Sequence, residues 1–78
     1  STFDEASLVN ADLSFAALYH CHFGEANLTG ANLSNANLLY TTFGKANLTS
    51  ANLRGAIEVQ GYGEAILQNT IMPDGSVK

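Results

Sequence analysis

The sequence has few of the residues that usually stabilise or equip a small domain. One cysteine in 78 residues excludes an internal disulfide framework. Three Lys and Arg stand against seven Asp and Glu, and a net charge of −4 argues against a nucleic-acid-binding surface. No apolar run approaches the ~18 residues of a membrane span, and we expect no signal peptide at the start of the chain. Because a globular core of this size is marginal, stability must come from another arrangement.

What the sequence does contain is a five-residue repeat. Eleven consecutive blocks have Leu or Phe at their centre and a small residue two positions earlier, which is Ala in eight of them. A period of five fits no regular element, because it turns a helical side chain by about 140° net and reverses the face of a strand. The backbone must therefore bend once per block, which predicts a stacked coil. The expected core ladder is Phe3, Leu8, Leu13, Leu18, Phe23, Leu28, Leu33, Leu38, Phe43, Leu48 and Leu53.

A second period, of twenty residues, lies inside the first. The centre is Phe rather than Leu only at Phe3, Phe23 and Phe43, and only these three blocks lack the preceding Ala. Four blocks per turn of the coil is the simplest explanation, and it predicts a square cross-section. Residues twenty apart then stack at the usual inter-strand spacing of roughly 4.8 Å, so the three Phe side chains should form an internal ladder.

The blocks at 26–30, 31–35 and 46–50 read ANLTG, ANLSN and ANLTS, and they resemble the A-(D/N)-L-x-x pattern of the pentapeptide-repeat family. The resemblance covers residues 1–55 without a gap. It implies an all-β fold, a right-handed quadrilateral β-helix with four pentads per coil, of which the chain would form about three and a half coils. The handedness rests on the resemblance alone. The ending Met72-Pro73-Asp74-Gly75 is similar to that of small cyanobacterial members.

The repeat predicts a single β-helix domain over residues 1–75, regular over 1–55, with a tail at 76–78. It is disturbed over 56–64, because Glu58 takes the position of a central Leu and a charge inside the column would be costly. We expect a loop-interrupted coil here, followed by final pentads over 65–74.

The disturbed segment has two interpretations. We favour an outward loop, Gly61-Tyr62-Gly63-Glu64. The alternative is a capping helix over 56–67 with Ile57, Val59 and Leu67 buried, which Gly61 and Gly63 disfavour by about 1 kcal/mol each.

The sequence offers no convergent chemical site. In the repeat frame, Cys21 of His20-Cys21-His22 points inward and the two histidines point outward, whereas a zinc site needs convergent ligands. Asp12 has no second catalytic group placed to work with it. We therefore expect no catalytic, metal or cofactor-binding residue and no small-molecule substrate.

Four apolar side chains should point outward on an otherwise Ser/Thr/Asn surface. They are Phe15, Tyr19, Leu39 and Tyr40. Such exposed patches often mark contacts, although stacked aromatic side chains could instead serve only to stiffen the wall of the coil. The first coil should also present unpaired backbone edges, which we expect another chain or an upstream segment to cover.

The sequence thus predicts a non-enzymatic structural or protein–protein interaction module. Its partner would be a protein or a second copy, bound through the N-terminal coil or the aromatic face, and not nucleic acid or a membrane. Some members of the resembled family mimic DNA and inhibit gyrase, so a topoisomerase regulator is the alternative. The acidic charge fits this alternative, but the acidic residues follow no phosphate-like line. We expect a soluble chain whose compartment is not indicated.

Overall fold

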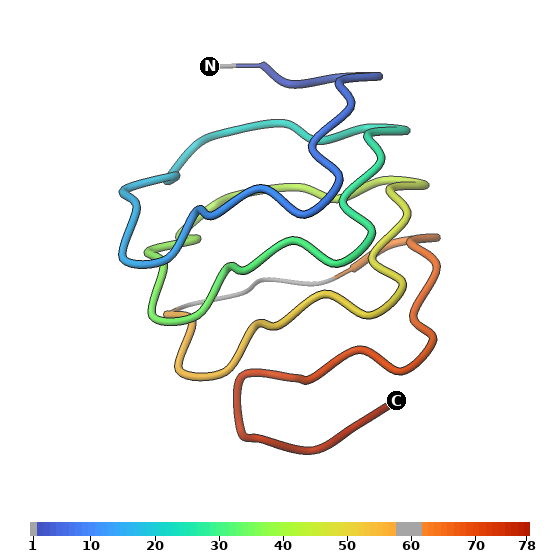
Figure 1. Cartoon of the computed structure of the whole chain (residues 1–78). Helices are drawn as coiled ribbons and strands as arrows, with labels where there is room; N and C mark the ends of the chain where they lie inside the picture. The colour runs from blue at the N-terminus through green and yellow to red at the C-terminus, as the bar shows by residue number, and fades with distance from the viewer. Residues whose placement is uncertain (1, 58–61) are drawn as a thin grey trace.

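The computed structural model describes residues 2–57 and 62–78. The chain winds down one axis as a stack of coils, with its first residues at one end and its last residues at the other (Figure 1). Coil 1 spans 2–21 and coil 2 spans 22–41. Coil 3 begins at 42 and is described to 57, and coil 4 spans 62–78.

Neighbouring coils are joined by isolated parallel bridges rather than long strands, so the strand content is low. Ser7 pairs with Asn27, and Asn27 pairs with Asn47, so the partners lie twenty residues apart. The other sides of the first three coils have the same spacing, from Thr2↔His22 to Asn37↔Ile57. This is the spacing that the Phe period predicts for four pentads per coil.

A tight turn ends each pentad and bends the chain toward the next side. The amide of the residue three positions after a centre donates to the carbonyl of that centre, as Ala26 does to Phe23 at 3.0 Å. In the regular pentads, the second residue after the centre has positive φ, with values of 55–62° where it is not glycine. This is the sign that a type II turn requires at that position. Four such turns close one circuit of the coil.

Where Asn or Asp precedes a centre, its side chain supports the turn. The Asn27 Oδ1 atom accepts hydrogen bonds from the amide of Thr29 at 3.1 Å and from its hydroxyl at 2.7 Å. Asp12 makes the same pair of bonds with Ser14, at 3.1 and 2.7 Å. These bonds, the one from the hydroxyl first, hold the pKa of the Asp12 carboxyl below its usual value. The Asn and Asp positions are therefore used to fix the backbone.

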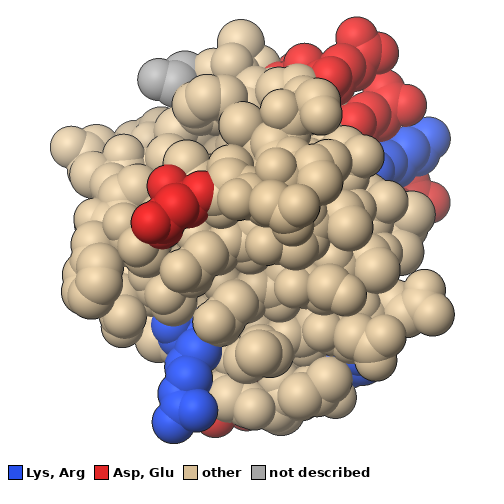
Figure 2. All heavy atoms as spheres, in the orientation of Figure 1, with Lys and Arg blue, Asp and Glu red and all other residues tan. Residues whose placement is uncertain are grey.

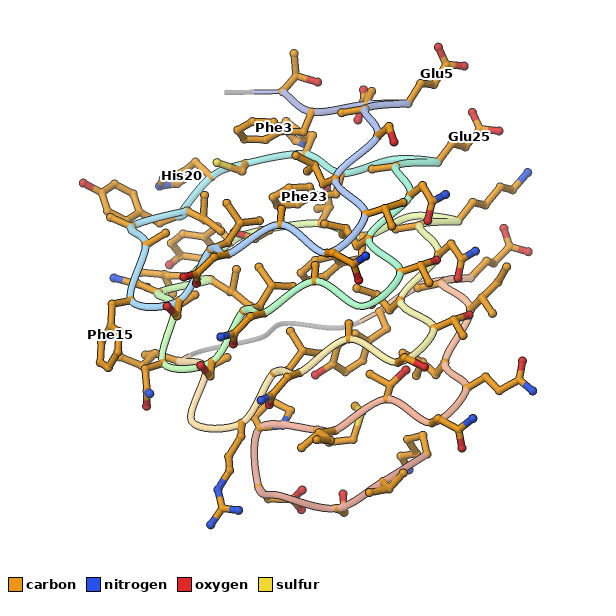
Figure 3. The ribbon with its side chains drawn as sticks, viewed as in Figure 1. Phe3, Glu5, Phe15, His20, Phe23 and Glu25 are labelled. Atoms are coloured by element: carbon orange, nitrogen blue, oxygen red, sulfur yellow. The ribbon has the colours of Figure 1, made fainter. Side chains whose placement is uncertain are left out.

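The centres fill the column. Phe23, Leu28, Leu33 and Leu38 of coil 2 are all 0% exposed, and the Ala residues between them are equally buried. The rings of Phe3 and Phe23 stack with centroids 5.0 Å apart, and those of Phe23 and Phe43 with centroids 5.4 Å apart. Figure 3 shows Phe3 directly above Phe23. The small residues let the walls approach, and the large centres occupy the space between them.

Tyr62 corrects the expected outward loop. Its ring packs inward on Phe43 with centroids 6.0 Å apart, so it continues the Phe ladder nineteen residues later rather than twenty. The later bridges, Asn47↔Ile66 and Asn52↔Ile71, have the same spacing of nineteen. The outward direction predicted for Tyr62 is therefore wrong, because the aromatic ring gains more by covering Phe43 than by entering water. The rest of the predicted interruption at 58–61 lies outside the described residues.

A signal for Tyr62 was present in the sequence. Phe23 is followed by Gly-Glu-Ala, Phe43 by Gly-Lys-Ala, and Tyr62 by Gly-Glu-Ala. The same aromatic–Gly–charged–Ala pattern therefore marks all three rings. Tyr62 is missed when a strict count of five is carried through the shortened segment.

The structure also excludes the disfavoured alternative of a capping helix, and it shows how the predicted tail is placed. Ile57 and Ile66 take part in parallel bridges to coils 2 and 3, which a helix over 56–67 would not allow. The tail at 76–78 turns back instead of hanging free. Val77 pairs antiparallel with Ile71, and the Lys78 amide donates to the Thr70 carbonyl at 3.0 Å. Backbone groups at the end of the column are satisfied in this way.

The buried column makes a quantitative prediction. Leu33→Ala should lower the free energy of unfolding by roughly 2–5 kcal/mol, because it leaves a cavity in a fully buried site. Leu13→Ala, on the same side of the half-buried first coil, should cost clearly less. Urea denaturation followed by circular dichroism measures both. Equal losses for the two variants would contradict the graded burial.

The aromatic ladder makes a second prediction. Tyr62→Ala should lower the free energy of unfolding by about 1–3 kcal/mol, less than for a fully buried ring, because Tyr62 covers Phe43 but stays half-buried. Tyr62→Phe should retain the stability, since the ring stays in place. Thermal or urea denaturation of the three proteins decides the matter. A cost below about 0.5 kcal/mol for the Ala variant would place the ring in solvent instead.

Candidate interaction surface

The cluster around Cys21 does not converge. Cys21 is buried in the column, whereas the two histidines beside it are exposed. The Nδ1 atom of His22 lies 2.9 Å from the Thr42 hydroxyl of the next coil, and His20 packs on Tyr40 instead. Over residues 2–57 and 62–78, no group of three His, Cys, Asp or Glu side chains could hold a metal ion. No helix in these ranges could span a lipid bilayer.

The exposed aromatic side chains gather at one side of the column. Phe15 is 76% exposed, Tyr40 is 56% exposed and Tyr19 is 52% exposed. Leu39 is half-buried between Leu38 and Tyr40. Phe15 projects away from the column at the preceding corner, as Figure 3 shows.

His20 joins two of these residues into one cluster. Its ring meets that of Tyr19 edge-on, with centroids 6.1 Å apart, and that of Tyr40 in a tilted arrangement, with centroids 5.0 Å apart. We use the name aromatic corner for Tyr19, His20, Leu39 and Tyr40 together with Phe15, which lies at the corner before them. The predicted contact set did not include His20. Its position twenty residues before Tyr40 could have shown that the two stack.

Three members of the aromatic corner have a backbone conformation that L-residues avoid. The φ angles of Phe15, His20 and Tyr40 are 59°, 61° and 59°. A left-handed conformation costs an L-residue roughly 1–2 kcal/mol. Asn and Gly tolerate this conformation better, and they fill several equivalent turn positions elsewhere, namely Asn10, Gly30, Asn35, Gly55 and Asn69. Glu5, Glu25, Lys45 and Ser50 fill the others with the same conformation, so the positive φ is a property of the turn, which does not itself require an aromatic side chain.

Charged side chains are few on the face of the molecule that Figure 2 shows. Glu5 and Glu25 project from one corner of the column, one above the other (Figure 3). In the space-filling view, most of the visible face is uncharged; acidic groups and a basic group lie at its upper right edge, one acidic group lies left of centre, and a basic group lies at the lower left (Figure 2). The aromatic corner itself contains no Lys, Arg, Asp or Glu.

A second surface lies at the first coil. In coil 2, the Asn27 amide donates to the Ala6 carbonyl at 2.9 Å, and its carbonyl accepts from the Leu8 amide at 2.8 Å, so both groups point toward coil 1. Ser7 takes the equivalent position in coil 1. Three sides of coil 1 have a residue in this position, with its N–H and C=O directed away from coil 2. These three residues make no backbone–backbone hydrogen bond within the described chain. They are Ser7, Asp12 and Ala17.

Comparison with known proteins relates this repeat architecture to a family and to a solved structure. Residues 26–57 match the family model of pentapeptide repeats, in eight copies. No curated protein matches the chain. Among solved structures, the chain is similar to the 2.0 Å crystal structure of HetL, a pentapeptide repeat protein involved in heterocyst differentiation regulation from the cyanobacterium Nostoc sp. strain PCC 7120, with 32% identity and a TM-score of 0.60. The match covers 99% of this chain and 40% of HetL, so the chain spans two fifths of the length of HetL. By its repeats, its twenty-residue coils and these similarities, the chain belongs to the pentapeptide-repeat family.

Proposed function

We propose that this chain is a non-enzymatic structural and protein–protein interaction module that binds a protein partner through the aromatic corner. The observation that carries the proposal is the exposure of Phe15, Tyr19 and Tyr40, which are each more than half exposed. His20 packs on two of these aromatic rings. Exposed apolar side chains that are grouped in this way often mark a contact surface.

The chemistry of the aromatic corner suits protein recognition. Tyr and other aromatic residues are enriched at the energetic centres of interfaces, because they bury much surface for few rotatable bonds. Here the stacked coils hold the side chains in place, and His20 packs between Tyr19 and Tyr40. A surface that is ordered before binding loses less conformational entropy when the partner arrives.

Family membership supports the same reading. It implies a right-handed β-helix, which we take to be the hand of this column, with four pentads per coil. HetL is described as involved in the regulation of differentiation, and a regulatory interaction is the kind of role that we propose for this chain.

Nothing favours the alternative of a DNA mimic. Lys45 follows Glu5 and Glu25 at the same position of successive coils, so a cation interrupts the row of acidic groups.

The proposal predicts how substitutions at turn positions affect stability. Phe15→Gly should leave the free energy of unfolding unchanged or raise it by up to about 1 kcal/mol, because glycine relieves the left-handed strain while its unfolded chain is more flexible. Ser50→Gly, at φ 60° on a corner without aromatic residues, is the matched control and should behave alike. Urea denaturation measures both. A loss above ~1 kcal/mol for Phe15→Gly alone would assign the ring a stabilising role.

Binding should respond differently. Affinity capture with the wild-type chain and the Ser50→Gly variant should retain the same protein, and both Phe15→Gly and Leu39→Ser should lose it. Titration calorimetry with that protein, once purified, should show Kd raised at least tenfold, about 1.4 kcal/mol, by either aromatic-corner substitution. Equal affinity for all four proteins would remove the aromatic corner as the binding surface.

A further inference from the structure

We propose that the partner of the aromatic corner is a protein segment with both apolar and basic residues, which lies across the adjoining side of the column. This inference rests on the proposed function and names the chemistry of the partner. The chain crosses this side between His20 and Glu25, and again between Tyr40 and Lys45. In Figure 3, His20 and Glu25 lie at opposite sides of the column.

Gly44, on this side, is a glycine that neither the turn nor the packing requires. It is exposed, its φ is not positive, and a Cβ atom added to it would meet nothing within 4 Å in the described chain. Gly30 differs, because its φ is positive and a Cβ atom there would collide with the Asn10 side chain. A glycine without a local reason often marks the place where another backbone approaches closely.

The rest of this side has little relief. Its solvent-facing residues are His22 and Gly24 in one coil and Thr42 and Gly44 in the next. The Nδ1 atom of His22 lies 2.9 Å from the Thr42 hydroxyl, so the one large side chain is tied to its neighbour. An extended segment can therefore lie flat against this side.

One end of this side carries charge that a basic segment would complement. The second residue after each aromatic centre is exposed there, and the Glu25 amide donates to the Gly44 carbonyl at 2.9 Å, which stacks these residues in successive coils. Three carboxylates and one ammonium group give this charged corner a net charge of −2. Complementary charge steers a partner and selects against wrong ones. The residues of the charged corner are Glu5, Glu25, Lys45 and Glu64.

The aromatic corner provides apolar contact at the other end. Tyr40 is 56% exposed, and Leu39 beside it is half-buried. The face of an exposed tyrosine ring also attracts a guanidinium group. Because one side of the column joins an aromatic end to an acidic end, it suits a segment with apolar residues followed by Arg or Lys.

An NMR titration of the isotope-labelled 78-residue chain tests the proposal. The probe is a blocked synthetic peptide of about nine residues, with Leu and Tyr in its first half and Arg and Lys in its second. At ~3.3 Å per residue, it can cross the 21 Å width of the column. The peptide should shift the amide resonances of Tyr40, Thr42 and Gly44 with a Kd of about 1 mM or lower, and added salt should weaken it.

The control peptide has Glu in place of every Arg and Lys, and it should bind at least ~10-fold more weakly. Equal binding of the two peptides would overturn the proposal. So would the absence of binding by the basic peptide, or shifts confined to the other sides of the column.

Matched variants locate the contact. Gly44→Gln should raise the Kd for the basic peptide at least ~10-fold, because it fills the open position. Val9→Gln, at the same pentad position of another corner, should leave the Kd unchanged. Glu25→Gln should raise the Kd and Lys45→Gln should lower it, each ~2- to 5-fold. An unchanged Kd in Gly44→Gln, or changes of the same sign in the two charge variants, would refute the proposal.

The outcome for the protein retained in affinity capture separates this proposal from the proposed function. If Leu39→Ser loses that protein and Gly44→Gln keeps it, the aromatic corner remains the binding surface and its extension across this side is wrong. If both variants keep it, the proposed function fails as well. Loss in both variants, with retention by Val9→Gln, is the result that we expect.

Discussion

The structure depends on one constraint, which is that the backbone must turn by about a right angle every five residues. In each turn, the amide of the residue three positions after a centre donates a hydrogen bond to the carbonyl of that centre. The residue two positions after the centre has a positive φ. Where Asn or Asp precedes the centre, its side chain also bonds to the turn. Once the turn repeats, the parallel bridges and the buried column follow from stacking.

The same constraint explains how much could be read from the sequence. The centres, the period of twenty and the Phe ladder were readable, because each depends on spacing that is uniform over 1–55. Tyr62 was not placed correctly, because the register between coils 3 and 4 shortens from twenty residues to nineteen and a fixed count then assigns the wrong centre. The folding back of the predicted tail at 76–78 was not foreseen, for another reason. Its antiparallel pairing with Ile71 is a long-range contact that no local pattern of three residues indicates.

The candidate surface was readable only in part. Outward positions follow from the repeat, so Phe15, Tyr19 and Tyr40 could be named in advance. The stacking of His20 on Tyr40 follows from their separation of twenty residues, whereas the edge-on contact of His20 with Tyr19 depends on the orientation of the two side chains. The left-handed φ at the aromatic corner depends on the type of turn, which the pattern of centres does not reveal. The residues that point to a function are therefore Phe15, His20 and Tyr40, because the turn accepts them at these positions but does not require them.

The C-terminal hairpin, in which Val77 pairs antiparallel with Ile71, has a consequence for growth of the column. Each coil presents to its successor a template of parallel, same-direction backbone, and a repeat of this kind has no length at which it must stop. By reversing the chain at Ile71–Val77, the hairpin substitutes an antiparallel pair for the next parallel one. The hairpin thereby occupies backbone groups to which another parallel coil would bind. This end of the described column is therefore a poor template for the addition of a further coil.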